Sequence, residues 1–235
     1  MSVWSARRFW KDATVHAEDG GFAVYLDTRP VRTPLKAPLV LPTEGLAHAV
    51  AAEWQAQEGK VNPATMPFTR TANSAIDTVA PQFEAVAAML AAYGETDLLC
   101  YRATGPAALI DRQAAAWDPL LDWTAKDLHA PLRTTAGVMH VDQPAASLAT
   151  LGAAVRTLSP FQLAAFHDLV AISGSLVLAL AVVHGRLTAD QAWALSRIDE
   201  DWKIEQWGAD EEAAEIAVLK HAALLQADRF YGLCG

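Results

Sequence analysis

The sequence is poor in cysteine: Cys100 and Cys234 are the only two thiols among its 235 residues. Two cysteines this far apart do not provide the disulfide framework of small secreted domains, so a reducing compartment is expected. Positions 12–21 are polar and offer no hydrophobic stretch behind the N-terminal residues, so no export signal is expected. These features predict the cytoplasm of a bacterium, or the mitochondrial matrix for a eukaryotic protein whose transit peptide has been removed.

The sequence also lacks an apolar run long enough to cross a bilayer. Its most apolar segment covers residues 169–183, about 15 positions, and contains Ser-Gly-Ser at 173–175. A membrane-spanning helix needs about 20 consecutive apolar residues. We therefore predict a buried helix here, in a protein that does not span a membrane.

Basic residues are too few for a nucleic-acid surface. The chain carries 18 Lys and Arg against 27 Asp and Glu, which gives a formal net charge of −9. Binding to nucleic acid depends on clustered cations that displace counterions from phosphates, so no nucleic-acid partner is expected. The negative charge is compatible with a partner protein that carries basic residues.

Motifs of catalysis and cofactor binding are absent from the sequence. It contains no glycine-rich phosphate loop, no Gly-x-Ser-x-Gly motif, and no His-x-x-x-His or Cys-x-x-Cys pair. Because neighbouring side chains on a helix diverge by about 100°, His167 and Asp168 are not expected to act as a base and its orienting carboxylate. No nucleotide, metal or other cofactor is expected, and neither is enzymatic activity.

What the sequence has in quantity is apolar surface, because 52% of its residues are hydrophobic. That is enough for one large domain or two unequal ones. Residues 12–16 and 22–26 are rich in β-forming residues, and Glu-Asp-Gly-Gly at 18–21 is typical of a hairpin turn. Prolines at every fourth position from 30 to 42 exclude a helix there. The first helix is predicted to begin after Thr43, a favourable N-cap.

From Pro81 onward the apolar residues recur at helical spacing, and glycine or proline marks most of the helix ends. The predicted helices cover approximately residues 81–94, 110–128, 144–158, 160–173, 175–184, 188–207 and 210–231. The predicted fold class is therefore α+β. A small α+β domain with short antiparallel strands occupies residues 1–80, and a larger all-α helical domain occupies residues 81–235.

The segment at positions 196–212 combines two tryptophans with seven acidic residues. On one continuous helix with its flanking residues, it would have two opposed apolar stripes, Leu195, Ile198 and Trp202 on one side and Trp193, Ile204 and Trp207 on the other. Such a helix is either buried on both sides or presents one stripe to a partner. We interpret the carboxylates between the stripes as a solvated acidic face, in preference to ligands of a divalent cation.

Short motifs spread over nearly the whole chain carry a family resemblance. They are RFW at 8–10, YLDTRPVRTP at 25–34, AEWQ at 52–55, MPFT at 66–69, AID at 75–77, DLLCYR at 97–102, WDPLLDW at 117–123 and DEDWKIEQWG at 199–208. In this order they resemble the assembly chaperones that bind the α subunit of the F1 sector of ATP synthase, in mitochondria and α-proteobacteria. The chain departs from the family pattern at Thr28, where Gly is expected, and at Lys203, where Gln is expected.

The resemblance implies a two-domain fold and a function without chemistry. The implied partner is the unassembled α subunit of F1-ATPase, which the chaperone binds, protects from aggregation and hands to the β subunit. Such a chaperone is expected to be monomeric when free. The resemblance directs attention to the acidic motif near the C-terminus, so the candidate partner-binding residues are Glu200, Asp201, Trp202, Ile204, Glu205 and Trp207. Trp54 is a further candidate, although its place on the Leu46 and Val50 stripe favours a structural role.

Two alternatives stay open on the sequence alone. An unrecognised hydrolase would require a pocket in which histidines and carboxylates with shifted pKa values converge. A general adaptor for the assembly of membrane complexes would bind several proteins, whereas the chaperone would capture one F1 subunit selectively.

Overall fold

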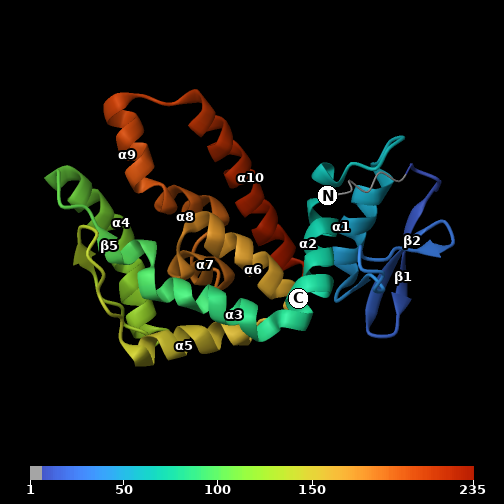
Figure 1. Ribbon diagram of the computed structural model, residues 1–235, viewed down its shortest axis with the longest axis horizontal. Helices are drawn as coiled ribbons and strands as arrows, with labels where there is room; N and C mark the ends of the chain where they lie inside the picture. The colour runs from blue at the N-terminus through green and yellow to red at the C-terminus, as the bar shows by residue number, and fades with distance from the viewer. Residues whose placement is uncertain (1–6) are drawn as a thin grey trace. The chain divides into compact units, whose positions relative to one another are not determined.

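The computed structural model describes residues 7–235, which divide into two compact units (Figure 1). The first unit takes in the chain up to Phe83 together with Ser159–Ala165 and Arg229–Gly235, and the second comprises Glu84–Leu158 and Phe166–Asp228. The class is α+β, as predicted, with the four-stranded sheet in the first unit and a mainly helical second unit.

The sheet of the first unit is built on the predicted hairpin. Its strands are β1 (Ala13–Glu18), β2 (Gly21–Leu26), β3 (Arg29–Pro30) and β4 (Val40–Leu41), with β1, β3 and β4 all antiparallel to β2. The turn between β1 and β2 depends on glycine, because Gly20 has a φ of +85°. A Cβ at Gly21 would lie 2.3 Å from the carbonyl oxygen of Leu41, so only glycine lets β4 approach β2 here.

Helix α1 (Glu44–Gln55) packs against this sheet, and α2 (Pro67–Ser74) packs against α1. The other helical segments of the first unit are η1 (Pro63–Thr65), the π-helical turn η2 (Ala75–Val79) and η3 (Ala80–Gln82). Thr43 is the N-cap of α1, as predicted, since its hydroxyl oxygen accepts a hydrogen bond from the Leu46 N–H at 3.2 Å. The carboxylate of Glu53 accepts hydrogen bonds from the N–H groups of Phe68 and Thr69, at 2.7 Å each, and so caps α2 from outside. Burial raises the pKa of Glu53, and these hydrogen bonds oppose the shift.

The hydrophobic core of the first unit includes residues from the C-terminal segment. Phe230 is fully buried, and its ring stacks on Phe68 with centroids 6.0 Å apart. Sequence periodicity assigns the C-terminal helix to one domain and so predicts a continuous division, 1–80 and 81–235. The compact units are not continuous in the sequence, because Phe230, near the end of the chain, packs on Phe68 in the first unit. A local sequence pattern does not reveal a contact between residues so far apart.

The second unit is mainly helical. Its helices are α3 (Phe83–Ala91), η4 (Ala92–Thr96), η5 (Leu98–Cys100), α4 (Ala107–Lys126), α5 (Ala145–Arg156), α6 (Pro160–Ser173), α7 (Leu176–Val183), α8 (Ala189–Ser196), α9 (Ile198–Trp207) and α10 (Glu211–Gly232), of which α3, α6 and α10 contribute residues to both units. Two short parallel strands, β5 (Tyr101–Arg102) and β6 (Thr135–Ala136), are the strands of this unit. Across the described residues, none of the helices has both the length and the apolarity to cross a membrane.

One predicted helix is wrong. The predicted helix at 188–207 is two helices, α8 and α9, separated at Arg197, whose φ and ψ of −112° and 12° are not helical. The Ser196 hydroxyl donates a hydrogen bond to the Trp193 carbonyl oxygen at 2.8 Å, which satisfies a carbonyl group at the end of α8. Because Trp193 lies on α8, and Ile204 and Trp207 lie on α9, the three do not form one stripe on a continuous helix.

A buried carboxylate joins two helices of the second unit. Asp97 is fully buried and accepts hydrogen bonds from the Leu99 N–H at 3.0 Å, the Ser175 hydroxyl at 2.8 Å and the Val177 N–H at 3.0 Å. These donors lie at the N-termini of η5 and α7, so one side chain caps both helices. Burial raises the pKa of Asp97, whereas the hydrogen bonds from Val177 and Leu99 favour the ionised carboxylate.

Replacing Asp97 by alanine should therefore destabilise the protein more than an ordinary surface substitution. Asp97→Ala leaves the Leu99 and Val177 N–H groups buried without an acceptor, and we expect the free energy of unfolding to fall by about 2–5 kcal/mol. Urea unfolding followed by circular dichroism measures the change. The control is Asp111→Ala on the exposed side of α4, with an expected change within about 0.5 kcal/mol. A loss below about 1 kcal/mol for Asp97→Ala contradicts the capping role.

Candidate functional site

Helix α9 presents large apolar side chains to solvent. Trp207 is 79% exposed and Ile204 is 41% exposed, whereas Ile198, at the beginning of the same helix, is buried. Trp202 is half-buried, as expected for the side of the helix that faces its own unit. The two opposed apolar stripes predicted from the sequence therefore exist within α9, with one turned inward and the other facing solvent.

Two acidic residues of α9 are held by α4. The Glu205 carboxylate forms an ion pair with the Arg112 guanidinium at 2.9 Å, and that guanidinium lies over the Trp202 ring at 5.5 Å from its centroid. Asp199 accepts a hydrogen bond from the Gln113 side chain at 2.6 Å. The buried Gln113 side chain and the stacking of Arg112 on Trp202 orient α9 on α4.

The remaining acidic residues of the motif differ in their pairing. Asp201 is half-buried and lies 3.5 Å from the Arg197 guanidinium, one helical turn before it. The Glu200 side chain is exposed and, within residues 7–235, makes no hydrogen bond or ion pair. Its carboxylate is therefore available to a cation from outside the chain, without the loss of an existing contact.

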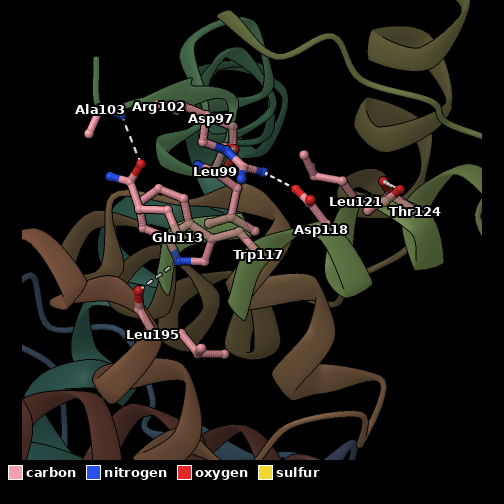
Figure 2. Close-up of polar contacts among 10 residues, drawn as sticks. All are labelled: Asp97, Leu99, Arg102, Ala103, Gln113, Trp117, Asp118, Leu121, Thr124 and Leu195. Carbon is pink, nitrogen blue, oxygen red and sulfur yellow. Dashed lines mark hydrogen bonds and ion pairs between the residues drawn. The ribbon is translucent and has the colours of Figure 1, made fainter. Parts of the chain in front are cut away.

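A buried polar frame supports α4 beneath this surface (Figure 2). The Gln113 side-chain oxygen accepts a hydrogen bond from the Ala103 N–H at 2.8 Å, so Gln113 joins the segment after β5 to α9. Trp117 is fully buried and donates its indole N–H to the Leu195 carbonyl oxygen at 2.9 Å, which ties α4 to α8. The frame thus reaches α9 through Asp199 and α8 through Leu195.

Arg102 completes this frame. Its guanidinium lies over the Trp117 ring at 5.3 Å and forms an ion pair with Asp118 at 2.8 Å, as Figure 2 shows for the pair. Its Nε donates a hydrogen bond to the Leu99 carbonyl oxygen at 2.8 Å. Arg102 therefore contacts both η5, which Asp97 caps, and Trp117, which holds α8.

The histidine, cysteine and acidic side chains of residues 7–235 are the groups that could form a metal site or a reactive thiol. Among the described residues, no three of the His, Cys, Asp and Glu side chains form a group that could hold a metal ion. Burial raises the pKa of both Cys100 and Cys234 to about 12, so neither is a thiolate at neutral pH. His167 and Asp168 do meet, at 3.0 Å, contrary to the expectation from helix geometry, and this hydrogen bond raises the pKa of His167.

Trp54 lies inside the core of the first unit. It is 5% exposed, and its ring packs edge-on against Trp10 with centroids 5.4 Å apart. A side chain this deeply buried cannot anchor a partner without leaving its core. The structural role favoured by its Leu46 and Val50 stripe agrees with this position, so Trp54 is not a candidate for the exposed binding surface.

The exposed apolar face of α10 is not apparent from the sequence alone. Val218 is 69% exposed, Leu219 is 71% exposed and Ile216 is 46% exposed. The sequence contains an apolar run, Ile-Ala-Val-Leu at 216–219, but periodicity does not tell which face of a helix is covered. Arg112 is not apparent from the sequence either, because its contact with Glu205 spans 93 positions.

Comparisons with known proteins agree with this architecture. A family model described as ATP12 chaperone protein matches residues 7–125. The mitochondrial protein atp12 of Schizosaccharomyces pombe is 27% identical over 226 residues, covering 90% of this chain and 77% of that protein.

Solved structures are similar over nearly the whole chain. Atp12 from Paracoccus denitrificans is 56% identical, with a TM-score of 0.95 and coverage of 98% of this chain and 99% of that one. An aspartate-to-lysine mutant of the same protein has a TM-score of 0.96, with 56% identity and coverage of 98% of each chain. A protein from Agrobacterium tumefaciens is 44% identical, with a TM-score of 0.91 and coverage of 97% of this chain and 85% of that one.

The frame beneath α9 can be tested through Gln113, which is 1% exposed. Gln113→Ala removes the partners of the Ala103 N–H and of Asp199, which should weaken the attachment of α9 by about 1–3 kcal/mol. We expect amide hydrogen exchange in α9 to accelerate by about tenfold or more. Exchange in the β1–β2 hairpin should not change, and Gln82→Ala, at an exposed position, should alter neither region. Unchanged exchange in α9 would show that Gln113 does not hold this helix.

Proposed function

This chain belongs to the ATP12 chaperone family, and we propose that it is a non-enzymatic assembly chaperone for the F1 sector of ATP synthase. Its client is the unassembled α subunit of F1. It binds that subunit, prevents its aggregation and hands it to the β subunit. The proposed compartment is the bacterial cytoplasm, or the mitochondrial matrix in a eukaryote, and the free protein is a monomer.

The physical problem defines what the binding surface must do. A subunit made for a ring exposes a large apolar interface before its neighbours arrive, and such surfaces aggregate. A chaperone has to cover this interface and later release it. Affinity concentrated in a few anchors, without a maximal buried area, meets both requirements.

The observation that carries the proposal is the exposure of Trp207. An indole that is 79% exposed leaves a large apolar surface in water, and tryptophan is strongly enriched among residues that dominate protein interfaces. Ile204 adds a second apolar contact one turn before it. We assign these two side chains as the anchors.

The carboxylates of α9 surround the anchors and favour a basic client surface. Glu200 has no partner among the described residues, so a client Lys or Arg can pair with it directly. Asp201 and Glu205 already pair with Arg197 and Arg112. Because these ion pairs are partly exposed, they contribute little to stability and can exchange partners at small cost. Trp202, under Arg112, completes the proposed surface.

Reversing the charge of Glu200 should abolish capture and leave the fold intact. Glu200→Lys places a cation where the client supplies one, and we expect at least about a tenfold loss of captured α subunit. The readout is the soluble fraction of the F1 α subunit on co-expression, with the F1 β subunit as the test of selectivity. Glu200→Gln should fall between wild type and Glu200→Lys.

The control for charge is Glu95→Lys, an equal change at an exposed position of η4, which should retain full capture. Lysine in the first turn of α9 opposes the helix dipole, so circular dichroism and hydrogen exchange in α9 must accompany the assay. Full capture by Glu200→Lys contradicts the assignment of Glu200 to the binding surface. A loss of capture that occurs only because α9 unfolds contradicts it as well. Equal capture of α and β subunits favours a general adaptor.

A further inference from the structure

The first half of α10 carries an unpartnered apolar face. Ile216 and Leu219 are 46% and 71% exposed, whereas Leu224 and Ala227, farther along the same helix, are buried. At about 100° per residue, Ile216, Leu219 and Ala223 form one stripe, on the side opposite His221, which packs against α8. The stripe does not serve the core of its own unit.

Acidic side chains border this stripe. Glu211, Glu212 and Glu215 are all exposed in the first turns of α10, and Lys220 is the one cation of the segment 211–220. The helix therefore pairs an apolar stripe with a negative border. A surface of this composition is complementary to an apolar surface bordered by Lys or Arg.

The helix is held firmly where it presents this face. The His221 ring stacks on Trp193 of α8, with centroids 5.2 Å apart and planes inclined by 16°, and its Nε2 lies 2.8 Å from the Asp190 carboxylate. These contacts fix α10 on α8 directly after the exposed stripe. A fixed binding surface loses less entropy when it binds.

We propose that the Ile216–Leu219 face of α10 is a docking surface for an amphipathic segment of the client, with apolar side chains bordered by Lys or Arg. The inference rests on the proposed function and adds a second contact region to α9. Residues 208–210 join the two helices (Figure 1), so Trp207 and the α10 stripe lie on adjoining elements. One client can therefore engage both.

Charge disfavours the other occupants of this face. An anionic membrane surface repels the three glutamates, and so does a second copy of this chain, which carries the same acidic border. A basic amphipathic segment gains from both the apolar contact and the opposite charge.

The test uses the full-length protein co-expressed with the F1 α subunit. Ile216→Asp combined with Leu219→Asp should reduce capture by at least about tenfold. The matched control is Val138→Asp combined with Met139→Asp, which also removes two exposed apolar side chains, 95% and 75% exposed, and adds two negative charges elsewhere in the second unit. Capture by the control should equal that of the wild type.

A second arm does not depend on destabilising changes. A benzophenone amino acid placed at position 219 should photo-crosslink to the α subunit, at a peptide rich in apolar residues and Lys or Arg. Glu212→Lys combined with Glu215→Lys should reduce that crosslink several-fold. If the aspartate variant misfolds by circular dichroism, the crosslink decides.

The outcomes separate the two proposals. Failure of the wild type to keep the α subunit soluble defeats the proposed function itself. If the Ile216→Asp, Leu219→Asp variant captures the α subunit as well as the wild type does, and position 219 gives no crosslink, the α10 proposal is wrong. The assignment of α9 is then unaffected. A crosslink only to a second copy of this chain, or to lipid in a vesicle assay with anionic lipids, overturns it as well.

Discussion

The buried carboxylate of Asp97 is the contact on which the second unit depends. It accepts hydrogen bonds from an N–H group in the first turn of η5 and from one in the first turn of α7. Both groups would otherwise be buried without acceptors. Because η5 is fixed in this way, Arg102 meets both Leu99 and Trp117. Trp117 in turn holds α8 through the Leu195 carbonyl oxygen. A short series of polar contacts therefore connects Asp97 to α8 and fixes the position of that helix.

These contacts explain how apolar side chains of α9 stay exposed to water: the helix is held in place and cannot turn them inward. Gln113 and Arg112 attach α9 by its acidic residues, so Trp202 faces α4 while Ile204 and Trp207 stay outside. His221 and Trp193 do the same for α10. The net charge of −9 keeps such a surface soluble. Rigid attachment and acidic borders together leave an apolar surface exposed beside negative charge, which is the combination that the proposed function requires.

The contrast between Trp54 and Trp207 is a matter of which neighbouring residues cover each ring. Trp54 and Trp207 both lie near the end of a helix, and both belong to motifs of the family resemblance. Trp54 is covered by Trp10, which comes from the chain before β1, whereas the described residues leave Trp207 mostly uncovered. The same side chain is a core residue in one unit and a binding anchor in the proposal for the other.

The sequence by itself determined the local structure: glycines at 20 and 21 give the hairpin, Thr43 begins α1, and the helical periodicity after residue 81 gives the helical unit. It also determined which residues of α9 share a face, and its motifs identified the family. It did not determine the break at Arg197, the burial of Trp54, the free carboxylate of Glu200 or the exposed face of α10. These depend on contacts such as Gln113 with Asp199, which lie 86 positions apart. Periodicity says which side chains lie together on a helix, but only the tertiary structure decides which of its faces another element covers.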